Sequence, residues 1–184
     1  MLTIIIPEQE AFNEKTNSFV KIKPCELKLE HSLLSLWKWE SKHHKYFLEN
    51  KDLNSEEIID YIRCMTLNKV DDYVYDFLTE KNIEDIKEYL VDPMSATWFS
   101  DSKKPQTGRK EIVTAELIYS SMIILNIPVE IFEKRHLNHV LTLIRVCSEK
   151  QNPDTNKNKQ NPKEVLQHYS ELNKARKAKL NTKG

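Results

Sequence analysis

The chain has 184 residues with 28 Lys or Arg and 28 Asp or Glu, so its formal net charge is zero. This length suits one domain with a real core, and only two glycines leave no cluster for a phosphate-binding loop or a dinucleotide fold. The charge is uneven: residues 151–184 hold eight basic against three acidic residues, and residues 1–150 hold 20 against 25. An acidic body with a basic tail argues against nucleic acid as a partner of the body, because phosphate binding needs a positive surface.

Short runs near the N-terminus alternate apolar with polar or β-branched residues: "LTIIIP", "SFVKIKP" and "ELKLEH". This alternation is typical of strands and predicts a small antiparallel β element. From His31 the apolar spacing becomes helical. We therefore expect an α+β fold that is mainly α, in which the N-terminal β element precedes a helical bundle and a flexible basic tail ends the chain.

The helical periodicity continues through most of the body. Asn54 with Glu57 three residues later predicts a capping box, and Asp92-Pro93 predicts a helix end. The two strongest patterns meet at Pro128 and predict an antiparallel helical hairpin that carries the core. Helices are expected over 31–48 (at least its first half), 54–67, 70–79, 82–93, 111–125 and 128–150. Expected buried positions are Ile58, Ile59, Ile62 and Met65 in the second helix and Ile118, Met122, Leu137, Leu141 and Ile144 in the hairpin.

The C-terminal part changes character after residue 150. Residues 151–163, "QNPDTNKNKQNPK", contain no apolar residue and two prolines, which predicts a flexible linker. Residues 164–184 regain helical spacing and end basic. The chain is thus expected to comprise a mainly helical domain over 1–150, a linker and a partly helical tail.

Residues 31–48, "HSLLSLWKWESKHHKYFL", suit an aromatic and basic platform, a histidine metal site or a core wall. Trp37 shares a stripe with Leu33 and Leu34, so we expect it to be buried. Trp39 lies on a different face, where it meets either a neighbouring helix or a partner. The core wall is the favoured interpretation of the stretch.

Histidine spacing favours structural roles. His43 and His44 diverge by about 100° on a helix. His136 and His139 are placed to share a face, but no H-E-x-x-H or G-x-S-x-G pattern accompanies them. We therefore predict no catalytic residue, no metal and no cofactor, and hence no enzyme.

Residues 92–110 form the long irregular segment of the body, yet they contain Trp98 and Phe99. These aromatics either fold back as plugs for the core or belong to an apolar surface for a partner. Basic residues of the tail are expected to add a second, charge-sensitive contact: Lys174, Arg176, Lys177 and Lys179.

The cysteines form no C-x-x-C pair, and the N-terminus lacks the basic flank of a signal peptide. The longest apolar run is interrupted and too short to span a bilayer. We therefore expect a soluble protein of the cytoplasm with no membrane partner.

Several segments together resemble a family of small tailed-bacteriophage proteins, the tail assembly chaperones encoded next to the tape measure protein. They are "LKLEHSLLSLWKWESKHHKYFL", "EEIIDYIRCMTL", "NIEDIKEYLVDPMSATWF", "TAELIYSSMIILNIPVEIFEKRHLNHVLTLIRVC" and "LNKARKAKLNTKG". The resemblance implies a non-enzymatic protein that binds the tape measure protein and the tail tube protein in the bacterial host, and it allows a homo-oligomer. The family pattern has bulkier aromatic residues where Ser120 and Ser121 stand.

Other classes remain open beside this one. A structural protein of the virion tail or connector has the same kind of composition, and it would stay in purified particles. A nucleic-acid-binding module acting through the basic tail would lose affinity steeply with salt.

Overall fold

The computed structural model describes residues 1–13, 18–48, 50–97, 99, 112–151 and 162–180. The prediction of a mainly helical α+β fold with an N-terminal antiparallel β element is confirmed. In chain order the elements are β1 (Leu2–Ile6), β2 (Gln9–Asn13), β3 (Ser18–Ile22), β4 (Cys25–Leu29), α1 (Leu33–His43), α2 (Ser55–Met65), the 3-10 helix η1 (Asp72–Phe77), α3 (Glu80–Val91), α4 (Ala115–Ile124), α5 (Val129–Phe132), α6 (Leu137–Gln151) and α7 (Pro162–Leu180).

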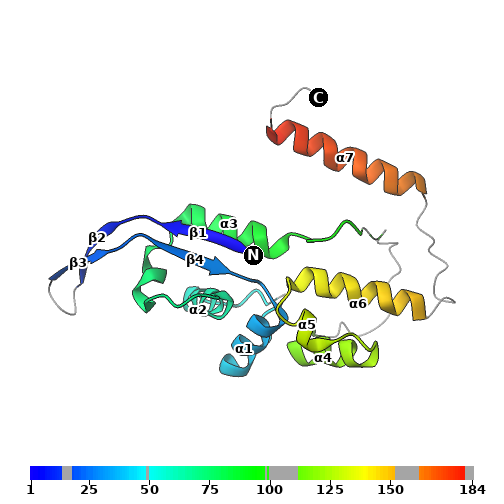
Figure 1. Cartoon of the computed structure of the whole chain (residues 1–184), viewed down its shortest axis with the longest axis horizontal. Coiled ribbons are helices and arrows are strands. Elements are labelled where there is room, and N and C mark those ends of the chain that lie inside the picture. The colour runs from blue at the N-terminus through cyan, green and yellow to red at the C-terminus, as the bar shows by residue number, and fades with distance from the viewer. Residues whose placement is uncertain (14–17, 49, 98, 100–111, 152–161, 181–184) are drawn as a thin grey trace.

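The strands form one long hairpin that is interrupted in the middle. β1 pairs with β4 and β2 pairs with β3, both antiparallel. The register is the same in both ladders, which places Pro7 opposite Pro24 at the interruption. Proline has no N–H to donate, so two facing prolines break the ladder into two short sheets. The sequence pattern missed β2 because its residues do not alternate; Figure 1 shows β2 and β3 extending beyond the helices.

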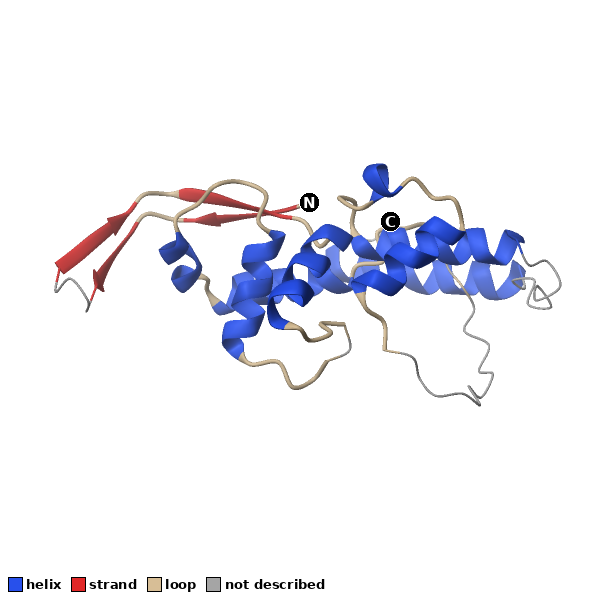
Figure 2. Ribbon diagram, turned by 90° about the horizontal axis from the view of Figure 1, so that it is seen from below, coloured by secondary structure: helices blue, strands red, loops and turns tan. Residues whose placement is uncertain are grey.

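One face of the β1–β4 sheet is buried. Ile4 and Ile6 of β1 and Leu27 and Leu29 of β4 point into the core. In Figure 2 the strands run along one side of the molecule and the helices that cover them lie on the other. The alternation expected from the sequence therefore reflects a sheet with one buried face and one solvent-exposed face.

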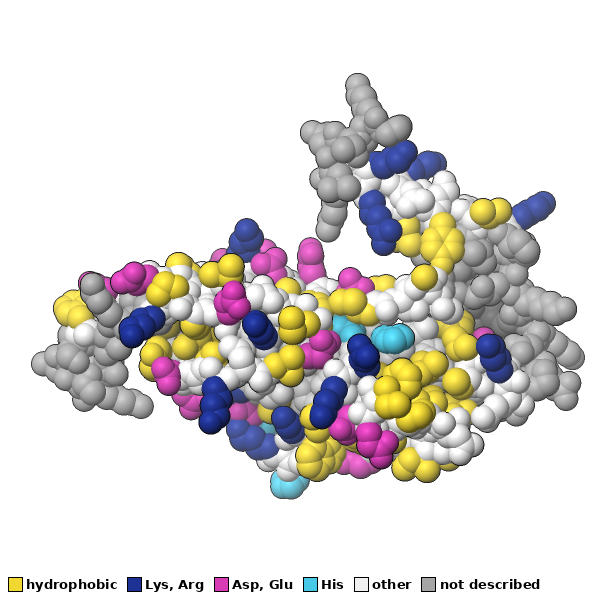
Figure 3. Space-filling view, in the orientation of Figure 1, with side chains coloured by type: hydrophobic (Ala, Val, Ile, Leu, Met, Phe, Trp, Pro, Cys, Tyr) yellow, Lys and Arg dark blue, Asp and Glu magenta, His cyan; other side chains and the backbone are white. Residues whose placement is uncertain are grey.

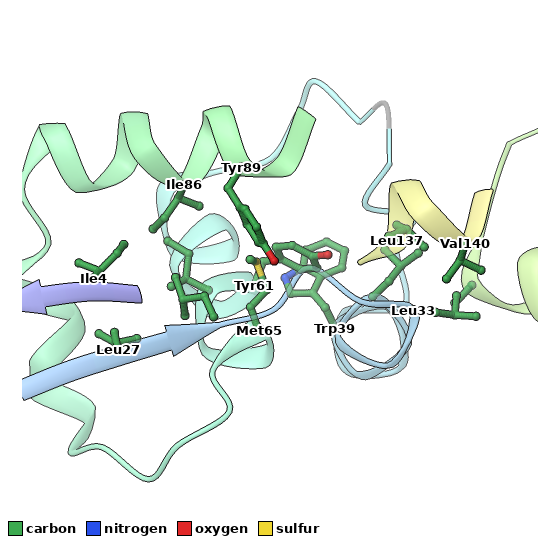
Figure 4. Close-up of a cluster of buried hydrophobic side chains, with 14 of the residues drawn as sticks. Ile4, Leu27, Leu33, Trp39, Tyr61, Met65, Ile86, Tyr89, Leu137 and Val140 are labelled. Carbon is green, nitrogen blue, oxygen red and sulfur yellow. The ribbon is translucent and has the colours of Figure 1, made fainter. Parts of the chain in front are cut away.

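Helix α1 lies at the centre of the body. Ser32 caps its N-terminus together with Ser35, and the left-handed His44 (φ 53°) ends it. Its buried residues recur at helical spacing and face both α2 and α4: Leu33, Leu36, Trp39 and Glu40. Figure 4 shows Trp39 next to Tyr61 of α2, between the sheet and α3 on one side and α6 on the other.

Helices α2 and α3 follow their sequence signals closely. The capping box of Asn54 and Glu57 is present, and α3 ends at Asp92, immediately before Pro93. In α2 the buried residues include Ile62 and Met65, as expected. The prediction that Ile58 is buried is wrong, since 38% of it is exposed. Tyr61 takes the inward position instead, against α1.

The predicted single helix over 128–150 is wrong: it is divided into α5 and α6. The interruption has a tertiary cause. The amide of Leu34 donates to the Glu133 carbonyl at 3.0 Å, and the amide of Leu137 donates to the His31 carbonyl at 2.7 Å. These long-range backbone bonds compete with the helical ones between α5 and α6. Of the predicted core positions in this hairpin, Ile118, Met122 and Leu137 are buried, while Leu141 and Ile144 are partly buried against the core.

The C-terminal helix α7 begins at Pro162, and α6 reaches Gln151. Most of the predicted linker, residues 152–161, lies outside the described residues. In Figure 1 α7 stands apart from the helices of the body. One described contact between them is a hydrogen bond from the Tyr169 hydroxyl to the Ala96 carbonyl.

Candidate partner-binding surface

Helix α4 is apolar on two opposite sides. Ala115, Ile118 and Met122 face the core. On the outer side Ile123 and Ile124 are 66% and 71% exposed. A helix that is hydrophobic all round is normally buried all round, but no element among the described residues covers the outer side of α4.

The neighbouring helix α5 extends this apolar area. Asn126 (φ 56°) adopts the left-handed conformation that turns the chain after α4, and Ile131 of α5 is 58% exposed. Figure 3 shows the resulting patch of hydrophobic side chains over α4 and α5. We call it the α4–α5 surface, and it consists of Leu117, Ile123, Ile124 and Ile131.

Small and charged residues border the α4–α5 surface. Ser120 and Ser121 stand on the outer side between Leu117 and Ile124, and the Ser121 hydroxyl donates to the Leu117 carbonyl at 2.8 Å. Glu116 and Glu130 are exposed at the two helix starts. The surface can therefore accept a bulky apolar side chain over the serines, with carboxylates at its margin.

The α4–α5 surface is held on the body by a buried carboxylate. Glu40 of α1 accepts hydrogen bonds from the amide of Ala115 at 2.8 Å and from the amide of Phe47 at 3.1 Å. Burial raises the pKa of Glu40, although these two hydrogen bonds oppose the shift. The first turn of α4 is thus fixed to the end of α1.

Replacing this carboxylate should loosen α4. We expect Glu40→Ala to lower the free energy of unfolding by about 2–3 kcal/mol, because the buried amide of Ala115 and the half-buried amide of Phe47 lose their acceptor. Glu116→Ala, which removes an exposed carboxylate from the first turn of α4, is the control and should change the free energy of unfolding by less than about 0.5 kcal/mol. Urea unfolding measures both, and equal effects would contradict the role of Glu40.

Charged residues also join α1 to α2 beside an open groove of about 660 Å³. Asp60 accepts from the Lys42 ammonium at 2.5 Å and lies 2.7 Å from His43 Nε2. Burial raises the pKa of Asp60, but the hydrogen bonds from Lys42 and His43 outweigh it, so the pKa ends below its usual range. Lys45 donates to Glu57 at 2.5 Å and lowers the pKa of that carboxyl as well. Asp60 and Glu57 are thus each paired with a lysine, and these ion pairs link the C-terminal end of α1 to α2.

Of the two alternatives for Trp39, a neighbouring helix or a partner, the structure shows the neighbouring helix. Trp39 has no exposed surface and donates its indole N–H to the Glu57 carbonyl of α2 at 2.9 Å. Trp37, expected to be buried, is 43% exposed. The cause is that α1 packs between α2 and α4, so the side with Trp39 faces a neighbouring helix. Trp39 as a partner-binding residue is therefore wrong.

The other predicted contact residues that the structure describes lie against α6 or on α7. Phe99 is half-buried, with the Arg145 guanidinium of α6 3.9 Å from its ring centroid, and Trp98 lies outside the described residues. Lys174, Arg176 and Lys177 are exposed on α7. Lys179 belongs to α7, but its side chain lies outside the described part. The basic residues do share one helix.

The two buried histidines have packing roles. His31 and His136 are buried, with ring centroids 5.2 Å apart. His31 Nδ1 lies 2.6 Å from the Tyr61 hydroxyl, and His136 Nε2 lies 3.1 Å from the Tyr89 carbonyl. His139 is exposed, so the His136–His139 pair does not converge. Among the described residues no three His, Cys, Asp or Glu side chains are placed to hold a metal ion.

The buried histidines predict acid sensitivity. Burial, with help from His136, lowers the pKa of His31 to about 3 from 6.5. Between these pH values the unfolded chain binds more protons than the folded one, so the free energy of unfolding falls as the pH drops below 6.5. The expected slope from His31 is about 1.4 kcal/mol per pH unit.

Urea unfolding at pH 7, 6 and 5 measures this slope. Glu40, with its raised pKa, acts in the opposite direction, so the comparison is with His31→Gln, which keeps Glu40 but does not titrate at position 31. The variant should show a clearly shallower loss of stability. Identical slopes would rule out His31 as the source.

Comparison with known proteins gives no match: no protein-family model, no curated protein and no solved structure is similar to the chain. Among the described helices, none combines the length and the apolar character needed to cross a membrane.

The sequence analysis missed the α4–α5 surface, although its signal was visible. The run "AELIYSSMIILNIPVEIF" holds more apolar residues than one buried face can use.

Proposed function

We propose that the chain is a non-enzymatic tail assembly chaperone of a tailed bacteriophage, which binds the tape measure protein and assists assembly of the tail tube. The observation that carries the proposal is the α4–α5 surface, where four aliphatic side chains lie exposed on two adjacent helices. Such an exposed apolar patch makes a monomer prone to aggregation unless a partner covers it. The resemblance of the segments quoted above to this chaperone family supplies the identity of the partner.

The chemistry of the surface supports an apolar, helical client. Leu117, Ser121 and Ile124 are spaced along one side of α4 as a groove partner requires, and a client helix presents its anchors at the same spacing. The acidic residues at the margin favour a client with basic residues beside its apolar face. The exposed basic residues of α7 offer a second contact, which we assign to the tail tube protein. The place of action is the cytoplasm of the bacterial host.

Co-expression tests the proposal. The client is the product of the long, helix-coding gene expected next to the gene for this chain. Expressed alone, the client should be insoluble; with this chain it should become soluble and co-purify. A client that stays insoluble in both cases contradicts the chaperone function. Presence of the chain in purified virions would instead favour the structural role.

The basic residues near the end of α7 also favour a second candidate, a nucleic-acid-binding module. Lys174, Arg176 and Lys177 are exposed there within one helical turn of each other. Binding of a DNA duplex that weakens steeply with salt, and that is lost on deletion of 162–184, would support this function over the chaperone.

A further inference from the structure

Helix α7 carries an apolar stripe that stays exposed. Leu166, Tyr169 and Leu172 recur at a spacing of three residues, so they lie on one side of the helix. Leu166 is 70% exposed, and Tyr169 and Leu172 are each 37% exposed. The Tyr169 hydroxyl donates to the Ala96 carbonyl, and the stripe remains open to solvent while this contact is made. A helix in a protein gains most of its stability by burying such a stripe.

The α4–α5 surface matches this stripe in spacing and in size. Leu117 and Ile124 stand at the two ends of the outer side of α4, about 10.5 Å apart along the helix axis, with Ser121 between them. On α7 the two leucines of the stripe are about 9 Å apart. With α7 antiparallel to α4, Leu166 meets Ile124 and Leu172 meets Leu117. The tyrosine of the stripe then lies over Ser121, whose small side chain leaves room for its ring.

The charges agree with the same arrangement. Arg176 is exposed one turn after Leu172, on the same side of α7. The antiparallel arrangement directs Arg176 toward the first turn of α4, where Glu116 is exposed. Opposite charges at the border of an apolar contact fix the orientation of the partners. Helix α7 thus has the apolar spacing and the basic flank that the α4–α5 surface favours in a client.

The connection between α6 and α7 allows this arrangement. Helices α4 and α6 pack against each other, and α6 is about 22 Å long. The ten residues 152–161 span up to about 33–36 Å when extended, which is more than the length of α6. The first turn of α4 is fixed to α1 through Glu40, and α6 runs away from α1 in Figure 1. A helix that follows α6 therefore reaches the C-terminal end of α4 first, as the antiparallel arrangement requires.

We propose that α7 binds the α4–α5 surface of its own chain in this antiparallel arrangement and thereby competes with the client. The competition rests on the proposed function, whereas the docking of α7 requires no client. Because α7 and the surface belong to one chain, they meet at a high effective concentration, which favours α7 over a second copy of the protein. A client must bind more tightly than α7 to displace it, so α7 covers the surface for only part of the time.

Disulfide formation in the full-length protein tests the docking without a client. In the variant Ile124→Cys, Leu166→Cys the two new thiols lie opposite each other in the proposed arrangement. In the control Ile124→Cys, Gln167→Cys the second thiol lies on the far side of α7 from Tyr169, one residue further along the chain. All three positions are exposed, so circular dichroism should show an unchanged fold. Oxidised glutathione starts the reaction at low protein concentration, and mass spectrometry identifies the linked pair.

We expect the disulfide between positions 124 and 166 to form within one chain at least about tenfold faster than the one between 124 and 167. Equal rates overturn the docking. Disulfides that join two chains overturn the assignment of α7 to its own surface.

The competition is tested with the solubilised client and the variant Leu166→Gln, Leu172→Gln. Its affinity for the client should exceed that of the wild type by at least about threefold, the gain expected when α7 covers the surface for two thirds of the time. An unchanged affinity overturns the competition. A client that binds neither protein contradicts the proposed function, and the disulfide rates still decide whether α7 docks.

Discussion

Trp39→Ala should reduce the free energy of unfolding by about 3–5 kcal/mol, the largest loss of stability that we expect from a single change. Its indole has no exposed surface. It is stacked on the His43 ring with the ring centroids 4.5 Å apart, and it meets the Phe47 ring edge to face with the centroids 5.1 Å apart. Truncation leaves a cavity where α1, α2 and the sheet meet, and it removes the donor to the Glu57 carbonyl.

Trp37→Ala is the matched control, because the same residue type stands two positions away on the same helix. With 43% of Trp37 exposed, its truncation should cost less than about 1 kcal/mol. Urea unfolding followed by circular dichroism compares the two variants. A larger loss of stability for Trp37→Ala than for Trp39→Ala would instead place Trp37 on the buried side of α1, as the sequence pattern suggested.

The double variant Ile124→Gln, Ile131→Gln should abolish client binding while leaving the fold intact. Both side chains are more than half exposed, so their loss should change stability by no more than about 1 kcal/mol. Each isoleucine buried by a client contributes about 1.5–3 kcal/mol, so affinity should fall by at least about a hundredfold. Glutamine is used because it removes apolar surface without adding charge.

Leu67→Gln is the control for this variant. Leu67 is 62% exposed but lies beside β4, away from α4 and α5. Client solubilisation in co-expression should be normal for Leu67→Gln and lost for the double variant. Melting curves of the purified variants check that both remain folded. Equal solubilisation by both would place the client elsewhere on the molecule.

The fold was predictable where its signals are local. The capping box at Asn54 and the end of α3 at Asp92-Pro93 depend on side chains within a few residues of each other. The presence of β1, β3 and β4 as strands followed from the alternation within each of them. These features need no knowledge of distant contacts.

Features that depend on distant contacts were not predictable. The interruption between α5 and α6 results from backbone bonds to residues 31–34, about a hundred positions earlier in the chain. The orientation of α1 depends on α2 and α4 packing on two of its sides, so its apolar pattern alone could not decide between Trp37 and Trp39.

The α4–α5 surface illustrates the same limit. Sequence reasoning assigned the apolar run of α4 to the core, since it could not know that Ala115, Ile118 and Met122 would fill the buried side. Aromatics in an irregular segment attracted attention to Phe99, which lies against Arg145 instead. Excess apolar content in a surface helix was the better signal.

Hydrogen–deuterium exchange of the full chain with and without the solubilised client tests the central claim most directly, because it locates the bound client on the chain. The account predicts slower amide exchange over residues 115–132 when the client is bound, with α2 and the β1–β4 sheet unchanged. Client binding that leaves exchange over 115–132 unaltered, and slows it elsewhere, would contradict the account.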